Sequence, residues 1–173
     1  IAGILCAAIL SDTLLFRSPT CTEMDKLVAE HLAEIAEIDI EKFAMRMFEE
    51  GSQLRKKADS EIFYQDYKKF VASDIPYGVG QITSMNREEL FSVQERLLAY
   101  MESAMQETGI PMIFFMLTDI LKESTRLLFV GDDAKTLVEN SFHQAAEEHY
   151  IDLEGVVSRK KQLIPKLTAV LQQ

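Results

Sequence analysis

The stretch "IPMIFFMLTDILKESTRLLFVG", residues 110–131, contains two apolar runs separated by a short polar segment. The first run, 110–121, is apolar almost throughout, and a glycine and charged residues bound it. These features favour a strand that is buried on both faces. The second run, 124–131, is predicted to form the neighbouring strand. Together the two runs predict the centre of a β-sheet.

Helical patterns lie on both sides of these two strands. Residues 86–109 carry apolar side chains at helical spacing and end at Gly109, which predicts one helix with a glycine stop. A shorter helix is predicted within residues 132–142, followed by a strand in "HYIDLEGVV", 149–157. Strands that alternate with helices in this way predict an α/β (α+β) domain, a compact mixed sheet flanked by helices.

An earlier β-forming stretch, "FVASDIPYGVGQITSM" at residues 70–85, is predicted to add a strand to this sheet. It contains Gly78 and Gly80, but no helix follows directly, so the pair does not form a dinucleotide-binding fingerprint. Glycine inside a strand indicates either a bulge or a closely packed backbone. Both alternatives stay open at this stage.

The first 50 residues or so have the apolar spacing of helices. Thr22, followed three residues later by Asp25, predicts a capping box at the start of one of them. The helical pattern ends at Gly51, and the polar segment "GSQLRKKADS" follows at residues 51–60. We therefore predict a helical segment at 1–52 and a sheet domain at 53–173.

The overall charge limits the classes of partner. The 173 residues include 18 Lys and Arg against 28 Asp and Glu, a formal net charge of -10. This charge opposes attraction to nucleic acid and to anionic lipid. The apolar opening "IAGILCAAIL" has only 10 residues, whereas a membrane span needs about 20. We expect a cytoplasmic protein with reduced thiols at Cys6 and Cys21 and without nucleic-acid or membrane partners.

A cluster of cations interrupts this acidic sequence in "GVVSRKKQLIPKL", residues 155–167. Arg159, Lys160 and Lys161 follow a predicted strand and precede a predicted helix that begins at Gln162. Charge clusters are commonly solvated, which is one interpretation. The position at the carboxyl end of a strand, just before free helix amides, favours the other, a phosphate clamp built on Arg and Lys.

Two further residues are candidates for a functional site. Asp12 interrupts the apolar sequence "AAILSDTLLF", 7–16, as either a helix-terminal or surface residue or a ligand for a hard divalent cation. A carboxylate buried in such surroundings needs a partner because burying an unpaired charge costs several kcal/mol. Lys68 lies among aromatic residues in "YQDYKKF", 64–70, and its spacing alone is typical of a surface lysine.

Several of these segments resemble one known family. "AAILSDTLLFRSPTCT", 7–22, and "GVVSRKKQLIPKL" resemble the signature segments in the C-terminal half of family II, manganese-dependent inorganic pyrophosphatases, members of the DHH phosphoesterase superfamily. "FFMLTDILKEST", 114–125, resembles that family's central strand and following turn. "YGVGQITSMN", 77–86, is most similar to the variety with regulatory CBS domains. The resemblance implies that 1–52 belongs to the DHH domain and 53–173 is the DHH-associated C-terminal domain.

The resemblance also implies roles for individual residues. Asp12 corresponds to a metal ligand, Arg159 and Lys160 to residues that bind the terminal phosphate of pyrophosphate, and Lys68 to a further substrate contact. The implied reaction is metal-assisted hydrolysis of pyrophosphate to two phosphates, with Mn2+ (or Co2+ or Mg2+) as cofactor. The DHH motif and the other metal ligands of the family lie in its N-terminal half and do not occur here. We therefore expect the N-terminal DHH domain as a partner, a homodimer of the full-length enzyme, and no activity in the 173-residue chain alone.

Two other functions remain open at this stage. One is a related DHH phosphoesterase that acts on short oligonucleotides or polyphosphate, although the acidic composition argues against a long basic groove. The other is a non-catalytic module that binds a phosphate ligand or docks a partner.

Overall fold

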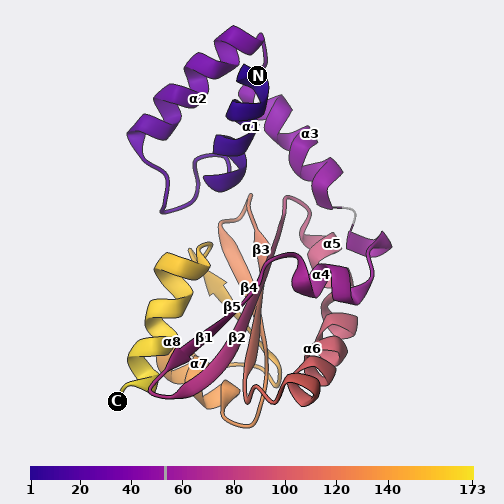
Figure 1. Cartoon of the computed structure of the whole chain (residues 1–173), viewed down its shortest axis with the longest axis vertical. Coiled ribbons are helices and arrows are strands. Elements are labelled where there is room, and N and C mark those ends of the chain that lie inside the picture. Colours follow the sequence, from indigo (N-terminus) through magenta and orange to yellow (C-terminus); the bar gives the residue numbers. More distant parts are fainter. Residues whose placement is uncertain (53) are drawn as a thin grey trace. The chain divides into compact units, whose positions relative to one another are not determined.

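The computed structural model describes residues 1–52 and 54–173, which form two compact units, Ile1–Gln53 and Leu54–Gln173 (Figure 1). Gln53, the first residue of the predicted sheet domain, lies outside the described residues. None of the helices in the described ranges combines the length and the apolar character that crossing a membrane requires.

The first unit consists of three helices, α1 (Ala2–Asp12), α2 (Glu23–Ala36) and α3 (Ile40–Ser52). Small and medium side chains fill its core, and they include Cys6, Leu10 and Ala29, which are completely buried. Small side chains let α1 and α2 approach closely, and the Cys6 thiol donates a hydrogen bond to the Ala29 carbonyl (3.6 Å). The predicted helical character of this segment is confirmed.

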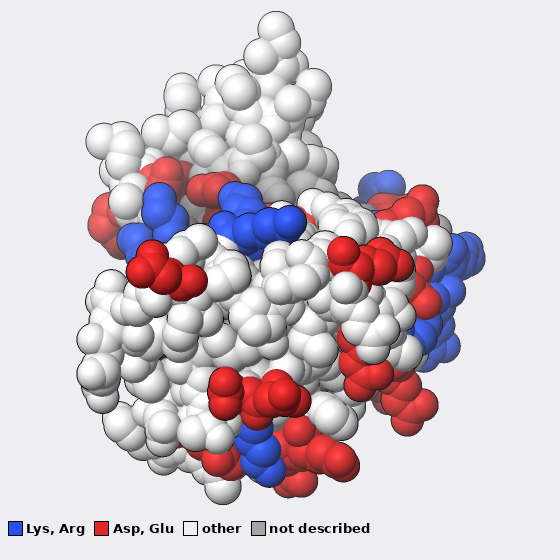
Figure 2. Space-filling view, turned by 60° about the horizontal axis from the view of Figure 1, so that its bottom comes forward, with Lys and Arg blue, Asp and Glu red and all other residues white. Residues whose placement is uncertain are grey.

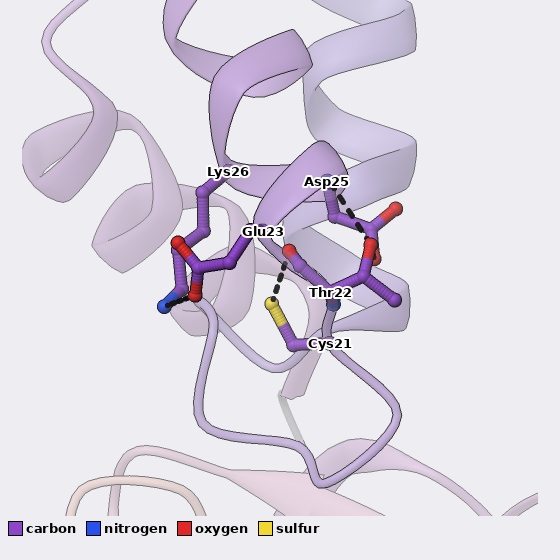
Figure 3. Close-up of polar contacts among 5 residues, drawn as sticks. All are labelled: Cys21, Thr22, Glu23, Asp25 and Lys26. Carbon is purple, nitrogen blue, oxygen red and sulfur yellow. Dashed lines mark hydrogen bonds and ion pairs between the residues drawn. The ribbon is translucent and has the colours of Figure 1, made fainter.

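Helix α2 begins with the capping box that Thr22 and Asp25 predict (Figure 3). The Asp25 backbone amide donates to the Thr22 hydroxyl (3.2 Å), and the Thr22 amide and hydroxyl both donate to the Asp25 carboxylate (2.8 and 2.7 Å). These hydrogen bonds from Thr22 to the ionised carboxylate lower the pKa of Asp25. The reciprocal bonds satisfy amide donors that the helix leaves without intrahelical partners, so local sequence fixes where α2 starts.

The second unit contains a five-stranded sheet in the order β1-β2-β3-β4-β5. In the described residues its strands are β1 (Tyr67–Ala72), β2 (Ile75–Ser84), β3 (Ile113–Asp119), β4 (Ser124–Val130) and β5 (Tyr150–Glu154). Strands β2 and β3 are parallel, while the other neighbouring pairs are antiparallel. All residues of β3 are buried, and β4 lies beside it, so the central pair predicted from 110–131 is confirmed.

Helices cover both faces of this sheet (Figure 1). The short turn η1 (Leu54–Lys56), α4 (Asp59–Gln65), α5 (Arg87–Ser92) and α6 (Gln94–Thr108) lie on one face. Helices α7 (Ala134–Phe142) and α8 (Ile164–Leu171) lie on the other. Strand β3 contributes to both cores, with Phe115 facing α6 and Phe114 facing α7 and α8. A strand between two helical layers has no polar face, which explains its continuous apolar run.

The prediction of a single helix over 86–109 is wrong. The chain forms α5 and α6 with a break at Val93, which has φ -102° and ψ -4°. The Ser92 hydroxyl donates to the Glu89 carbonyl (2.7 Å), and the Val93 side chain is completely buried. Such a hydroxyl competes with the helical backbone, and the break lets both short helices bury their apolar sides.

The stretch 70–85 forms a hairpin, whereas we predicted one additional strand. Ser73 and Asp74 both have left-handed φ values, 47° and 63°, which match the tight turn between β1 and β2. Of the two alternatives for the glycines in β2, the closely packed strand is correct. A Cβ atom on Gly80 would lie 2.2 Å from the Phe115 ring, and one on Gly78 would lie 2.0 Å from the Tyr67 hydroxyl.

The Tyr67 hydroxyl is buried against Gly78 and has no hydrogen-bond partner within the described part of the chain. Its burial raises the pKa of Tyr67 from 10.0 to about 12. Tyr67→Phe removes this unpaired hydroxyl, so we expect the free energy of unfolding at pH 7 to rise by about 1 kcal/mol. Chemical denaturation measures this change.

The same substitution has an expected pH dependence. The pKa of Tyr67 is higher in the folded state than in the unfolded state. Below pH 10 both states keep the Tyr67 proton, and as the pH rises towards 12 the unfolded state loses it first, so the free energy of unfolding falls. Tyr67→Phe is therefore expected to lose less stability than the wild type as the pH rises from 10.0 towards about 12. Equal losses in the two proteins would contradict a buried, unpaired hydroxyl.

Candidate functional site

The cationic segment lies in a loop and the first turn of a helix. Strand β5 ends at Glu154, and Gly155, with φ +70°, turns the chain out of the sheet. Ser158 then caps a wide π-helical turn, η2 (Arg159–Leu163), by accepting a hydrogen bond from the Lys161 amide (3.3 Å). The predicted strand to Val157 and the predicted helix start at Gln162 are therefore both wrong.

The reason for this difference is that side chains, and not a neighbouring strand, bond to the two valines that precede the cations. Gln81 donates to the Val157 carbonyl (3.1 Å) and Thr125 donates to the Val156 carbonyl (2.6 Å), while both valines are buried (8% exposed for Val156 and 4% for Val157). The loop buries both side chains, and the helix starts at Arg159 immediately after them. Arg159, Lys160 and Lys161 thus occupy the first turn of the helix.

Arg159 is held in a fixed orientation at the edge of the sheet. Its Nη1 donates to the carbonyls of Asp66 (2.6 Å) and Val79 (3.2 Å), and its Nη2 donates to the Asp66 carboxylate (2.7 Å). Only 8% of Arg159 is exposed. Among the contacts within the described ranges, its Nε hydrogen has no acceptor. This edge of the guanidinium, Nε with Nη2, has the planar geometry that suits two oxygens of a phosphate group.

Strand pairing brings Lys68 to the same place. Lys68 lies opposite Val79 in the antiparallel pair β1 and β2, and the Val79 carbonyl is one of the acceptors of Arg159. Lys68 also shares a face of β1 with Phe70, which packs against the core under α7 and α8. The Lys68 side chain therefore starts on the face of the sheet that η2 and α8 cover, and it is exposed.

Lys160 follows Arg159 in the same turn and is exposed. The structure thus places Lys68 opposite the strand residue that Arg159 contacts, and Lys160 directly after Arg159 in η2. Their role in binding a substrate stays a prediction.

Asp12 lies in the first unit, at the last residue of α1, and it is exposed. Asp12 thus occupies the helix-terminal, exposed position that was one of the two alternatives, and its role as a metal ligand stays a prediction. Thr13 comes next and is buried, with its hydroxyl donating to the Ile9 carbonyl (2.7 Å). Leu14, Leu15 and Phe16 then have left-handed φ values of 49°, 53° and 65°. Consecutive non-glycine residues in this region are strained, and such strain is concentrated at functional sites.

The described residues do not by themselves form a metal site. They contain no group of three or more His, Cys, Asp or Glu side chains arranged to hold a metal ion. A hard divalent cation takes about six oxygen ligands, so Asp12 supplies one ligand at most in a larger set.

The surface around the sheet carries both signs of charge. On the face drawn in Figure 2, lysine and arginine side chains form small groups that alternate with groups of aspartate and glutamate. Both signs of charge are therefore present on that face, in a chain whose net charge is -10.

Sequence reasoning missed Asp66, which orients Arg159. The sequence contained one indication of this role: in "YQDYKKF" an acidic residue precedes the candidate Lys68 by two residues. Its partner, Arg159, lies at the other end of the domain, and only the folded sheet brings the two together.

The DHHA2 domain family model matches residues 45–170. The chain belongs to the DHHA2 domain family. It is 42% identical over 171 residues to a probable manganese-dependent inorganic pyrophosphatase of Clostridium acetobutylicum, covering 99% of this chain and 55% of that protein. It is 43% identical over 173 residues to a manganese-dependent inorganic pyrophosphatase of Methanothrix thermoacetophila, covering 99% of this chain and 56% of the relative.

A cobalt-dependent inorganic pyrophosphatase of Clostridium perfringens is 41% identical over 170 residues, which are 98% of this chain and 31% of that protein. A crystal structure from Methanococcus jannaschii, assigned to family II inorganic pyrophosphatases, matches with a TM-score of 0.88 and 39% identity. That match covers 98% of this chain and 55% of the other. This DHHA2 chain therefore spans about half the length of most of these relatives, and the resemblance inferred from its sequence is confirmed.

Proposed function

We propose that this chain is the C-terminal, substrate-binding half of a metal-dependent inorganic pyrophosphatase that hydrolyses diphosphate to two phosphates. Relatives named as inorganic pyrophosphatases support the activity. The observation that carries the role of this half is the fixed guanidinium of Arg159 beside Lys68. In this proposal Arg159, Lys160 and Lys68 form a cationic clamp on pyrophosphate.

The clamp is suited to a small ligand of high negative charge. Arg159 presents its Nε hydrogen and the second Nη2 hydrogen to two oxygens of one phosphate, because Asp66 and Val79 accept from Nη1 and from the other Nη2 hydrogen. Lys68 and Lys160 are exposed and contribute mobile positive charges from two sides. As the bond between the phosphates breaks, these cations stabilise the charge that develops on the leaving phosphate. Because Asp66 and Val79 already fix the guanidinium of Arg159, this group does not have to change its orientation during the step.

We further propose that the metal ions are bound mainly by an N-terminal DHH domain, with Asp12 as one ligand from this chain. The strained turn at Leu14–Phe16 supports a functional role for the carboxylate that precedes it. The names of the relatives support Mn2+, or Co2+, as the metal. When bound, such a metal supplies an activated water. The residues of this chain bind the substrate and neutralise its charge.

A domain that packs on the first unit also accounts for its exposed apolar side chains. Ile4, Leu5, Leu27 and Ile35 of α1 and α2 are between 50% and 76% exposed. We propose that the N-terminal DHH domain covers them in the full-length protein, since soluble domains bury contiguous apolar surface at interfaces. A cytoplasmic location and a homodimer of the full-length enzyme complete the proposal.

A comparison of substrates tests this function. We expect the full-length protein with Mn2+ to hydrolyse pyrophosphate at least about 100 times faster, in kcat/KM, than a dinucleotide or a long polyphosphate, because its clamp fits one small anion. Preference for the dinucleotide or polyphosphate would instead establish the related phosphoesterase. Binding of pyrophosphate without turnover would establish a non-catalytic module.

A further inference from the structure

We propose that Gln162 is a positioning residue of the clamp, an inference that rests on the proposed function. Its side-chain amide makes three hydrogen bonds to the loop before Arg159. Oε1 accepts from the Val157 amide (2.9 Å) and the Ser158 amide (2.8 Å), and Nε2 donates to the Gly155 carbonyl (2.6 Å). The Gln162 side chain therefore holds both ends of the segment Gly155–Ser158. Because Arg159 and Lys160 follow this segment directly, Gln162 also determines where their backbone lies.

The wide turn of η2 explains why Gln162 can reach this loop. In a capping box, a Gln or Glu three residues after the N-cap reaches back to the N-cap amide. Here the N-cap is Ser158, and Gln162 follows it by one residue more. The Leu163 amide donates to the Ser158 carbonyl (3.2 Å), which is the spacing of a π-helical turn and brings the later residue into the capping position.

The sheet holds the same loop from the opposite side. Gln81 of β2 donates to the Val157 carbonyl (3.1 Å), and Thr125 of β4 donates to the Val156 carbonyl (2.6 Å). Thr118 of β3 joins these two side chains, at 3.1 Å from the Gln81 amide nitrogen and 3.0 Å from the Thr125 hydroxyl. These side chains fix the loop to the sheet, and Gln162 is the group that fixes the loop to the helix carrying the cations.

This arrangement determines the geometry of the clamp in two steps. The Gln162 amide fixes the path of the backbone up to Ser158, and Ser158 caps the turn that carries Arg159 and Lys160. Asp66 and Val79 then fix the guanidinium of Arg159, whereas the exposed Lys160 side chain makes no equivalent contact within the described residues. The position of Lys160 therefore depends most on the loop.

The test replaces Gln162 with methionine, which has a similar length but makes none of the three hydrogen bonds. In the full-length enzyme we expect Gln162→Met to lower kcat/KM for pyrophosphate on the order of 10- to 100-fold, since small displacements of a binding group have effects of this size. Hydrogen exchange of the peptide containing residues 155–163 is expected to accelerate, while that of β3 stays unchanged.

A double-mutant cycle separates positioning from general stability. If Gln162 acts through Lys160, Gln162→Met is expected to have an effect at least about 3-fold smaller in a Lys160→Ala background than in the wild type. An equal effect in both backgrounds would overturn the positioning role. Gln144→Met is the matched control, because Gln144 lies in the loop after α7 and its amide also donates to a backbone carbonyl, that of Asp152 in β5 (3.1 Å). We expect this control to leave kcat/KM within about 2-fold of wild type.

Other outcomes distinguish this inference from the proposed function. If Arg159→Ala and Lys160→Ala leave turnover unchanged, the clamp itself is wrong. If they impair turnover but Gln162→Met changes neither turnover nor exchange of the loop, only the role of Gln162 is wrong. Gln81→Leu removes the support from the opposite side and provides a second variant, which is expected to lower kcat/KM in the same direction.

Discussion

Lys160→Ala in the full-length enzyme is expected to lower kcat/KM for pyrophosphate about 100-fold or more, which corresponds to about 3 kcal/mol of lost transition-state stabilisation. Lys160 is exposed in the first turn of η2, and it directly follows Arg159 in the chain. A direct contact with phosphate in a cleft that excludes water is a charge-assisted hydrogen bond, and losing one has effects of this size. Steady-state kinetics with pyrophosphate measures the change.

Lys166→Ala is the control for this substitution. Lys166 lies in the adjacent helix α8, where its ammonium group is 5.0 Å from the centre of the Phe142 ring. Removing it changes the net charge by the same amount, so we expect kcat/KM to stay within about 2-fold of wild type. If the two substitutions have the same effect, net charge would explain the result and Lys160 would have no place in the clamp.

The 173-residue chain alone is expected to show no pyrophosphate hydrolysis above a buffer blank, even with Mn2+ present. Within its described ranges the chain offers no group of three acidic, histidine or cysteine side chains for a metal, and Asp12 alone is a weak ligand. The clamp neutralises charge on the phosphates, but the reaction also needs an activated water as the nucleophile. Without that water, the bond between the two phosphates is not broken. Phosphate release with full-length enzyme as the positive control measures the difference.

A binding measurement on the same chain separates substrate binding from hydrolysis. Calorimetric titration of the chain with a pyrophosphate analogue is expected to show weak binding that Arg159→Ala abolishes, since half of the site still offers its cations. Manganese-dependent turnover by the chain alone would contradict the division of labour between the two halves.

The elements of the fold were largely predictable from local sequence. The apolar run of β3 and the neighbouring β4, the stop at Gly109 and the capping box at Thr22 each depend on residues close together in the chain. The break at Val93 was not predictable, because it depends on burying one side chain beneath two helices. The β1–β2 hairpin was missed for a different reason, since its turn at Ser73 and Asp74 lacks the glycine that usually marks such turns.

The residues of the candidate site were likewise predictable only in part. The cations Arg159 and Lys160 stood out as a cluster in an acidic chain, and the relation to a known family pointed to Lys68 and Asp12. The contacts that orient Arg159 were not predictable from local sequence, because Asp66 and Val79 are distant from it in the chain and two of the three contacts are to backbone carbonyls, which every residue has. The exposure of Asp12 was also decided by structure, by the residue at which α1 ends.

The sequence by itself determined the central strand pair, the helical character of the first unit and which residues carry the positive charge, because periodicity, capping and charge are local properties of the chain. Only the tertiary structure decided that Lys68 lies opposite Val79 and that Arg159 bonds to that same residue. Strand register and the packing of η2 against the sheet bring these groups together. Such contacts depend on how the two cores of the sheet domain pack, and residues from the whole domain contribute to each core. No single segment of the sequence determines this packing.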